Sequence, residues 1–449
     1  MEHWDVIIIG AGYGGLCTGA LLCRGGKKVL VLEKEGALGG RAKSVLYCGH
    51  VLDDGAHIPS RAGHLESIFS DLGLEYPEVV LLNKSEIYHE GTWKNPKQLF
   101  SPATFKRALA EIMKYSACEL TALDDLPLKE WVERISGEEG IDVLFFYLGC
   151  ATSVGNRFET YSAGEMVYII REILDRGLKL SEIGGVIRGG MNSILNPLAE
   201  YIRSHGGEIR LKTPVESVEV GNGRAVGVNV EEGERLFRSQ VMNVSTLKAD
   251  FVIVTVPLWE LFSVVNDEHV PRWWADWVQW LGGKVSQAWS IIYGLDEPLF
   301  DTATFRWAPR LPESGLSGIF YPMPTYGDAV GQYQFHVSYQ GHYDEFPDLL
   351  DRGRARVRAG IRDIIAMLER ESIRLYPRLK DGYCWRIAHA GVYGIAQSPG
   401  FVGLKRPSMR VPGIPNLFIV SNTVREARGI GMSAVGNCAR MAAETILGA

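Results

Sequence analysis

The chain has 449 residues, of which 46% are hydrophobic and 22% are charged, a composition typical of a globular protein. At about 150 residues per domain, this length predicts roughly two or three domains. The formal net charge of −6 lacks the basic excess that is typical of nucleic-acid binding, so we expect no nucleic-acid partner.

Signals for export, membrane insertion or metal binding are missing from the sequence. The opening MEHWDVIII has no basic region, and its hydrophobic run is too short for a signal peptide. No hydrophobic run reaches the roughly 18 residues of a membrane-spanning helix. Seven cysteines are scattered without a CxxC pair, which favours reduced thiols and argues against a zinc site. We therefore expect a cytoplasmic protein without a metal centre.

The N-terminal end has the pattern of a dinucleotide-binding βαβ unit. A hydrophobic strand over 5–9 precedes the glycines of GAGYGG, a helix that ends at a glycine pair, and a second strand that ends at Glu33. Gly10 permits the tight turn, Gly12 lets a pyrophosphate approach the backbone, and Gly15 lets helix and strand pack closely. The helix N-terminus offers free N–H groups to the phosphates. Glu33 would bond the ribose hydroxyls and repel a 2′-phosphate, which disfavours NADP.

A second glycine motif favours FAD over NAD. KEGALGGRAKS and GHVLDDGAH follow Glu33, and a flavin nucleotide is long enough to contact them, whereas an NAD site does not need them. These motifs resemble the FAD-dependent amine oxidase and phytoene desaturase superfamily, whose opening pattern is GxGxxGG, E-K-x4-GGR and D-x-G. In that family the arginine lies near the pyrophosphate and the D-x-G segment passes the flavin. The resemblance implies that FAD is bound by Gly10, Gly12, Gly14, Gly15, Glu33, Lys34, Gly40, Arg41, Gly55, Ala56 and His57.

The resemblance continues through the middle of the chain. We expect a helix over about 192–204, a strand at 208–211, a hairpin that turns at 221–223, and a buried strand over 250–257. Val215 matches the position whose backbone meets the adenine in the family. A plain edge-strand valine is compatible with the same sequence.

The C-terminal segment departs from the family pattern at two residues. NLFIVSN matches the family's NL(Y/F)xxGD, except that Ser421 and Asn422 replace glycine and aspartate. The resemblance implies that Asn422 bonds a hydroxyl of the cofactor, as the aspartate does in relatives. It also implies that Gly431 and Met432, at the start of the last helix, contact the flavin N1/O2 edge.

The fold that these motifs predict is α/β, with a Rossmann-like FAD-binding domain interleaved with an α+β substrate domain, whose mixed sheet is covered by helices. We expect the FAD-binding domain over 1–75, 181–257 and 405–449, and the substrate domain over 76–180 and 258–404. Within the substrate domain, periodicity predicts helices over 102–115, 126–135 and 163–176, and strands over 78–82, 286–294 and 332–340.

A tryptophan-rich segment allows two interpretations. PRWWADWVQWLGG predicts a helix over 271–283 on which Trp273, Trp277, Trp280 and Leu281 share one face. The residues 271–281 could dip into a bilayer, so that the protein is membrane-associated. We favour packing of this face on the substrate domain, because the polar face lacks a Lys/Arg cluster.

Three side chains of the substrate domain are candidates for contact with the reacting centre. Lys284 resembles an amine-oxidase lysine that holds a water near flavin N5, although a solvent-exposed strand end is the alternative. His389 and Tyr393 lie in DGYCWRIAHAGVYGIAQSPGF, a stretch that runs close to the flavin in the superfamily. With Trp385 they are spaced by four, which suits a helix face, but the intervening glycines argue against a regular helix.

The resemblance implies an FAD-dependent oxidoreductase that removes hydride from a hydrophobic small molecule, by desaturation of a C–C bond or related redox chemistry. GGRAKSVLYCGHVLDDGAHIPS looks closer to the desaturase and retinol-saturase branch, whereas Lys284 favours an amine oxidase acting on a C–N bond. No second GxGxxG lies between 60 and 400, so electrons would pass to oxygen, a quinone or another carrier. The alternative from another class is a non-catalytic binding protein like the Rab GDP-dissociation inhibitors, which resemble the superfamily but carry no flavin.

Overall fold

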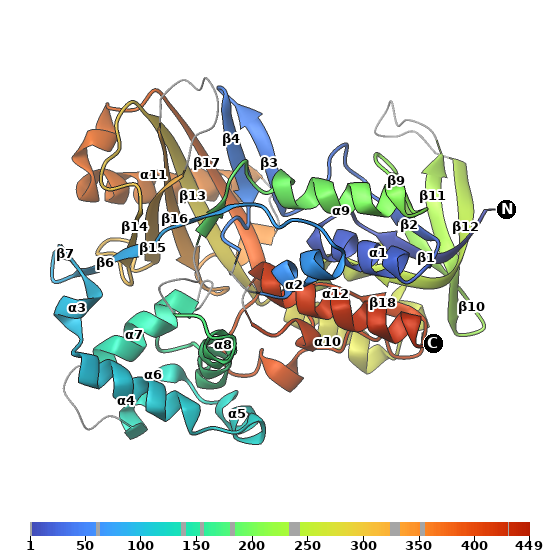
Figure 1. Ribbon diagram of the computed structural model, residues 1–449, viewed down its shortest axis with the longest axis horizontal. Coiled ribbons are helices and arrows are strands. Elements are labelled where there is room, and N and C mark those ends of the chain that lie inside the picture. Colours follow the sequence, from blue (N-terminus) through green and yellow to red (C-terminus); the bar gives the residue numbers. More distant parts are fainter. Residues whose placement is uncertain are drawn as a thin grey trace.

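The computed structural model describes residues 2–59, 63–135, 141–152, 157–179, 185–232, 243–323, 333–350, 355–429 and 431–449. In these ranges the strands form two large sheets at opposite ends of the molecule, and a lobe of helices lies beside the second sheet (Figure 1). Both chain termini lie on the side of the first sheet.

The first sheet takes its strands from the three segments expected for the FAD-binding domain. Its order is β10-β11-β12-β1-β2-β9, and β18 also pairs with β12. The pairs of β1 with β2 and β12, of β2 with β9, and of β12 with β18 are parallel, while β10 and β11 are antiparallel neighbours. The strands are β1 (His3–Ile9), β2 (Val29–Leu32), β9 (Glu208–Arg210), β10 (Val215–Gly221), β11 (Arg224–Glu232), β12 (Asn243–Val254) and β18 (Leu417–Ile419).

Burial on both faces explains the sequence of the central strands. The side chains of Val6, Ile7 and Ile8 in β1 are fully buried, as a continuous hydrophobic run in a parallel sheet requires. Helix α1 (Tyr13–Arg24) lies between α9 (Asn192–Ser204) and α12 (Gly431–Leu447), and α2 (His64–Asp71) packs on α12 (Figure 1). The helix expected over about 192–204 is therefore confirmed.

The second sheet has the order β17-β13-β16-β15-β14-β6-β7 and is mixed, because only β14 and β6 are parallel. Its strands are β6 (Lys84–His89), β7 (Thr92–Lys94), β13 (Val285–Leu295), β14 (Thr304–Ala308), β15 (Ser317–Met323), β16 (Tyr333–Gly341) and β17 (Trp385–Ile395). Helix α11 (Ala355–Leu375) contacts β13 and β17. Two smaller pairs link the sheets: β3 (Ala42–Tyr47) with β4 (His50–Gly55), and β5 (Val79–Leu81) with β8 (Gly185–Ile187).

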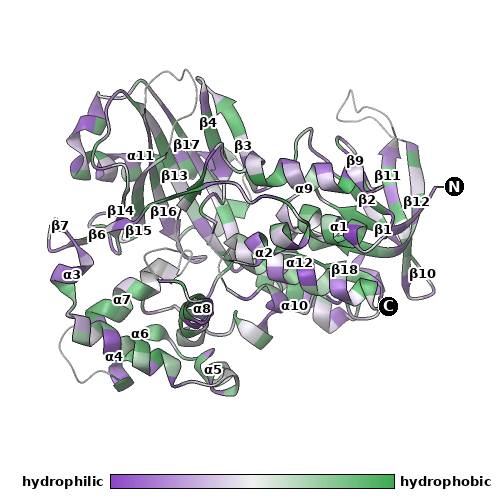
Figure 2. Ribbon diagram, viewed as in Figure 1, coloured by the Kyte–Doolittle hydropathy of each residue, from purple (hydrophilic) through white to green (hydrophobic). Residues whose placement is uncertain are grey.

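The helical lobe forms a separate hydrophobic cluster beside the second sheet. It contains α3 (Pro96–Leu99), α4 (Pro102–Met113), α5 (Ala117–Leu123), α6 (Leu128–Ile135), α7 (Ile141–Thr152) and α8 (Ala163–Asp175). Helix α7 is hydrophobic along most of its length (Figure 2) and contacts α4, α6 and α8. The helices predicted over 102–115, 126–135 and 163–176 are confirmed as α4, α6 and α8. The expected boundary between 180 and 181, and residue 332 of the third predicted strand, lie outside the described residues.

Our prediction of which face of the tryptophan-rich helix is buried is wrong. Helix α10 (Arg272–Gly282) buries Trp274, Ala275, Val278 and Leu281 in the core of the first sheet, not against the second sheet. Trp273 is 65% exposed and Trp280 is 52% exposed. Gly282 allows this side of the helix to pack closely on the preceding segment. A Cβ on Gly282 would lie 3.2 Å from the Cα of Trp259.

A buried ionic cluster joins the helical lobe to the C-terminal segment. The Arg428 guanidinium contacts Asp124, and its Nε donates to the Glu165 carboxylate at 3.0 Å. The Glu165 carboxylate also accepts a hydrogen bond from the Gly429 N–H at 3.2 Å. Burial raises the pKa of Asp124, and the charge of Arg428 opposes that rise. The cluster fixes the segment before α12 against α8.

Among the described helices, none combines the length and the hydrophobicity that crossing a bilayer requires.

Candidate cofactor and substrate site

The glycines of the first turn have two different geometries. A Cβ on Gly15 would lie 2.0 Å from the Gly10 oxygen, and Gly14 packs within 2.9 Å of the Val420 oxygen by the same measure. Gly10 has a φ of +105°, a backbone conformation that disfavours other residues. At Gly12, in contrast, the nearest atom to an added Cβ is 3.8 Å away. Gly10, Gly14 and Gly15 therefore hold helix and strand together, while Gly12 faces open space.

This open space is bounded by the second glycine motif. A Cβ on Gly40 would find only the Gly12 Cα, at 3.9 Å, and a Cβ on Gly431 would find nothing within 4 Å. Gly12 precedes the N-terminus of α1, and Gly431 begins α12. Two helix N-termini with side-chain-free backbone are suited to bind phosphate and other negatively charged groups.

Two backbone hydrogen bonds fix the Glu33 carboxylate directly after the end of β2. Its side chain is 5% exposed, and its two oxygens accept hydrogen bonds from the Ala11 N–H at 2.8 Å and the Glu35 N–H at 2.9 Å. The Thr213 N–H donates to the Glu33 carbonyl at 2.8 Å, which brings the start of β10 at Val215 to the same edge. The Lys34 side chain is exposed and lies 3.7 Å from the Glu260 carboxylate.

Arg41, Asn422 and the backbone of β17 form one hydrogen-bonded unit. Arg41 donates to the Tyr393 carbonyl at 2.8 Å and to the Asn422 Oδ1 at 3.2 Å. Asn422 Nδ2 donates to the same Tyr393 carbonyl at 2.6 Å. A carboxylate at position 422 cannot make this second bond, because it has no N–H to donate. The asparagine therefore suits this chain's own β17.

An Asn422→Asp variant should keep its bond to Arg41 but lose its bond to Tyr393. A carboxylate oxygen would then face the Tyr393 carbonyl, and we expect a loss of about 1–3 kcal/mol in the free energy of unfolding. Urea denaturation of the FAD-free protein measures this value. An unchanged midpoint would show that the amide donor has no role. A compensating rise in FAD affinity would support the predicted contact of residue 422 with the cofactor.

The D-x-G segment leads into a buried pair of aromatic side chains. Gly55 must stay small, because a Cβ would lie 2.0 Å from the Arg41 oxygen, and the Ala56 N–H donates to that oxygen at 3.1 Å. His57 Nδ1 lies 2.5 Å from the Gly55 carbonyl, which can only accept, so Nδ1 carries the proton. The unprotonated Nε2 then accepts a hydrogen bond from the Tyr321 hydroxyl.

Burial keeps the neighbouring groups neutral. Desolvation raises the pKa of Tyr321 well above its usual value and lowers the pKa of His336 well below its own. The His336 ring stacks on Tyr321 with centroids 5.4 Å apart, and its Nε2 donates to the Gln334 Oε1 at 3.2 Å. Burial also raises the pKa of Tyr393, while a hydrogen bond with Ser338 opposes the rise. Tyr321, His336 and Tyr393 can therefore take part in proton transfer from an uncharged resting state.

The candidate catalytic residues lie on the edge strand β17 of the second sheet or just before its neighbour β13. The segment around His389 and Tyr393 is the strand β17, and not a helix, with a register irregularity beside Tyr393. His389 pairs with Ser290 of β13, which in turn pairs with Ser338 of β16. The Lys284 ammonium lies 4.7 Å from the Tyr343 ring and 5.6 Å from the Trp280 ring. The structure thus brings His389 into the row of Ser290 and Ser338 and directs Lys284 toward the aromatic side chains of residues 280 and 343.

Tyr321 and His336 were missed by the sequence argument. The signal for His336 is the alternation in YQFHVSYQG (333–341), in which Gln334, His336, Ser338 and Gln340 alternate with hydrophobic residues. The hydrophobic members pack in the core under α11, so the polar members share the opposite face. All four polar side chains lie along a strand whose residues are mostly buried, which indicates a functional face and not a solvated one.

The parallel sheet, the two helix N-termini and Glu33 define a dinucleotide-binding protein. The profile of the family described as flavin containing amine oxidoreductases matches residues 13–447. The chain therefore belongs to this family and is a flavoprotein of the oxidoreductase class.

Known proteins agree with this assignment. A 4,4'-diapophytoene desaturase (4,4'-diapolycopene-forming) of a Methylomonas species is 25% identical over 280 residues, 55% of this chain and 53% of that protein. The chain spans about half the length of the curated relatives it matches. Its fold is similar to an oxidoreductase from Methanosarcina mazei (TM-score 0.72, 18% identity, 98% and 99% of the two chains). It is also similar to a triple mutant of putrescine oxidase (TM-score 0.66, 16% identity, 100% of both chains).

FAD is the cofactor that the family and the residues support together. The open space at Gly12 and Gly40 fits a pyrophosphate, and the fixed carboxylate of Glu33 fits a ribose without a 2′-phosphate. The residues that would hold FAD are the predicted set described above, from Gly10 to Met432.

Proposed function

We propose that this protein desaturates a C–C bond of a largely hydrophobic small molecule. The observation that carries the proposal is the buried, hydrogen-bonded His57–Tyr321 pair. Desaturation removes a hydride from one carbon and a proton from its neighbour, so it needs a group that can accept the proton. Bound FAD supplies the hydride acceptor.

The pair can receive the proton in one step. Loss of hydride makes the neighbouring C–H bond of the substrate acidic, and its proton passes to the Tyr321 oxygen. The Tyr321 proton moves at the same time along the existing hydrogen bond to His57 Nε2. The electron pair of the broken C–H bond forms the new double bond. His389, Tyr393 and Lys284 remain candidates for contacts with the substrate, and oxygen, a quinone or another carrier would take the electrons from the reduced cofactor.

An amine oxidase is the second candidate. Putrescine oxidase has a similar fold, and Lys284 is the residue that favours this chemistry. Anaerobic stopped-flow absorbance of the purified holoenzyme separates the two, with phytoene in detergent micelles and putrescine as the substrates. We expect phytoene-type polyenes to reduce the flavin. Reduction by putrescine with no reduction by the polyene would contradict the proposal.

We also propose that residues 271–281 make peripheral contact with a membrane. Helix α10 leaves Trp273 and Trp280 exposed, and the Trp280 ring is 5.5 Å from that of Phe401, three residues before Leu404, which is 65% exposed. Exposed tryptophans are typical of surfaces that insert at the bilayer interface. The cytoplasmic location remains a prediction from the scattered cysteines.

Replacing Trp273 and Trp280 together by serine should weaken vesicle binding by about ten-fold or more, because two indole rings no longer leave water. Co-sedimentation with phosphatidylcholine–phosphatidylglycerol vesicles measures this effect. Tyr383→Ser is the matched control, since Tyr383 is an exposed aromatic residue on another surface. Equal binding by all three proteins would refute the membrane contact.

A further inference from the structure

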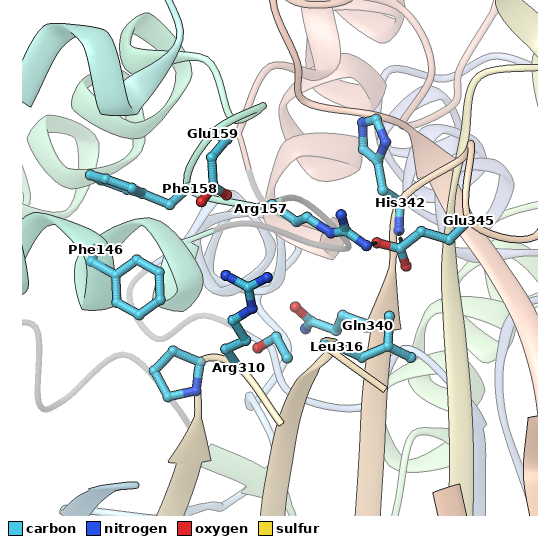
Figure 3. A pocket seen from close by; sticks show the side chains of 12 residues that line it. Phe146, Arg157, Phe158, Glu159, Arg310, Leu316, Gln340, His342 and Glu345 are labelled. Atoms are coloured by element: carbon cyan, nitrogen blue, oxygen red, sulfur yellow. Dashed lines mark hydrogen bonds and ion pairs between the residues drawn. The ribbon is translucent and has the colours of Figure 1, made fainter. Parts of the chain in front are cut away.

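A pocket lies between the helical lobe and the ends of the second sheet, and its lining contains none of the predicted FAD-binding residues (Figure 3). Helix α7 contributes Phe146, the segment after it contributes Arg157 and Phe158, and the strand ends contribute Arg310, Ser317 and Gln340. The pocket therefore combines aromatic walls with polar groups, as small-molecule sites do.

Of the two arginines in this pocket, Arg310 has no ion-pair partner among the described residues. Arg157 forms an ion pair with Glu345, whose carboxylate also accepts a hydrogen bond from the His342 N–H at 3.2 Å. Arg310 points into the space between Phe146 and Gln340 (Figure 3), and within the described part of the chain it makes no ion pair or hydrogen bond. Glu159 lies at the exposed rim, where water solvates its carboxylate. Arg310 thus presents two or more N–H donors to whatever enters the pocket.

A buried hydroxyl in the same pocket also lacks a partner. Ser317 is 8% exposed, and its Oγ has no hydrogen-bond partner among the described residues. A buried hydroxyl without a partner costs free energy, so most such groups are satisfied by a protein group, a water or a ligand. The pocket therefore contains an unsatisfied neutral donor as well as a cation.

The sheet register gives the position of this pocket relative to the Tyr321–His57 pair. Ser317 pairs with Gln340, and two residues further along the strands Ile319 pairs with Ser338. The next pair on this face is Tyr321 with His336. Ser317 and Tyr321 are four residues apart on one strand, which is about 13 Å. The pocket and the Tyr321–His57 pair therefore lie on the same face of one sheet.

We infer that the pocket binds the carboxylate of a ligand with a hydrocarbon chain. The Arg310 guanidinium matches the two oxygens of a carboxylate, and the Ser317 hydroxyl can donate to one of them. Phe146 and Phe158 cover the first carbons of the chain. The ligands that this arrangement selects are long-chain carboxylic acids.

Equilibrium dialysis of the FAD-loaded protein with radiolabelled dodecanoate and dodecan-1-ol tests the inference. These probes have the same carbon chain, so the difference between them measures the head group. Dodecanoate should bind the wild type about ten-fold or more tightly than the alcohol. Arg310→Leu should abolish this preference and leave the alcohol unchanged. Arg374→Leu is the control, since Arg374 is an exposed arginine at the end of α11 and should change neither affinity.

Equal affinities of the wild type for the two probes would overturn the inference, as would an unchanged preference in Arg310→Leu. The thermal midpoint of each variant shows whether it is folded, and Arg310 is an exposed residue whose loss leaves no buried group unpaired. Dialysis needs no electron transfer. A failure of polyenes to reduce the flavin would therefore refute the proposed function and leave the carboxylate site standing. Flavin reduction by polyenes together with equal binding of dodecanoate and dodecan-1-ol would refute only the site.

Discussion

Replacing Gly12 by valine should abolish FAD binding and leave the fold of the FAD-free protein intact. Gly12 has a φ of −79°, which any residue can adopt, and an added Cβ would meet no protein atom closer than 3.8 Å. The valine side chain would instead occupy the space into which the predicted pyrophosphate must fit. We expect at least about a hundred-fold loss of FAD affinity, or roughly 2.7 kcal/mol.

Fluorescence titration of the FAD-free protein with FAD measures this loss, and circular dichroism measures the fold. Gly15→Ala is the contrasting variant, because its Cβ would lie 2.0 Å from the Gly10 oxygen and must force α1 away from β1. Gly15→Ala should therefore unfold at a lower temperature, whereas Gly12→Val should not. A Gly12→Val protein that binds FAD normally would show that the cofactor does not lie against the first turn.

The Arg428→Met variant should lose about 3–5 kcal/mol in the free energy of unfolding. Arg428 is the cation that contacts both Asp124 and Glu165, and without it two buried carboxylates lose their ion-pair partner. Urea denaturation measures the loss. Adding Asp124→Asn and Glu165→Gln to the variant removes both acids, and this triple variant should recover part of the lost stability.

The loss should also depend on pH. Without Arg428, burial raises the pKa of Asp124 further above its unfolded value, so the folded state binds more protons than the unfolded state. The free energy of unfolding then falls as the pH rises, and the deficit should be larger at about pH 8 than at about pH 5. A deficit below about 1 kcal/mol at both values would show that the cluster is solvated and not essential.

The nucleotide half of the molecule could be predicted because its sequence rules are local. The strand β1, the turn glycines and Glu33 occupy a continuous segment, and each residue type is required by backbone geometry or by a ligand contact. The last helix followed from the same reasoning, and the structure begins it at Gly431. The α/β fold with a mixed second sheet and the flavin cofactor are confirmed on this basis.

The second sheet could not be predicted to the same depth. Its polar face exists only because β15, β16, β13 and β17 pair in a particular register, and β13 and β17 are distant in the sequence. His57 and Tyr321 are 264 residues apart. The error on α10 has a different origin: three tryptophans suggested the buried face, whereas close backbone packing at Gly282 selected the face that carries Trp274 and Val278.

The absorbance spectrum of the purified protein shows directly whether the chain binds a flavin. A flavoenzyme should show the flavin band near 450 nm, with about one FAD released per chain on denaturation. We predict this band, and we predict that the Gly12→Val protein prepared in the same way lacks it. A colourless wild-type protein that also fails to bind added FAD would contradict the account and leave a binding protein of the same fold.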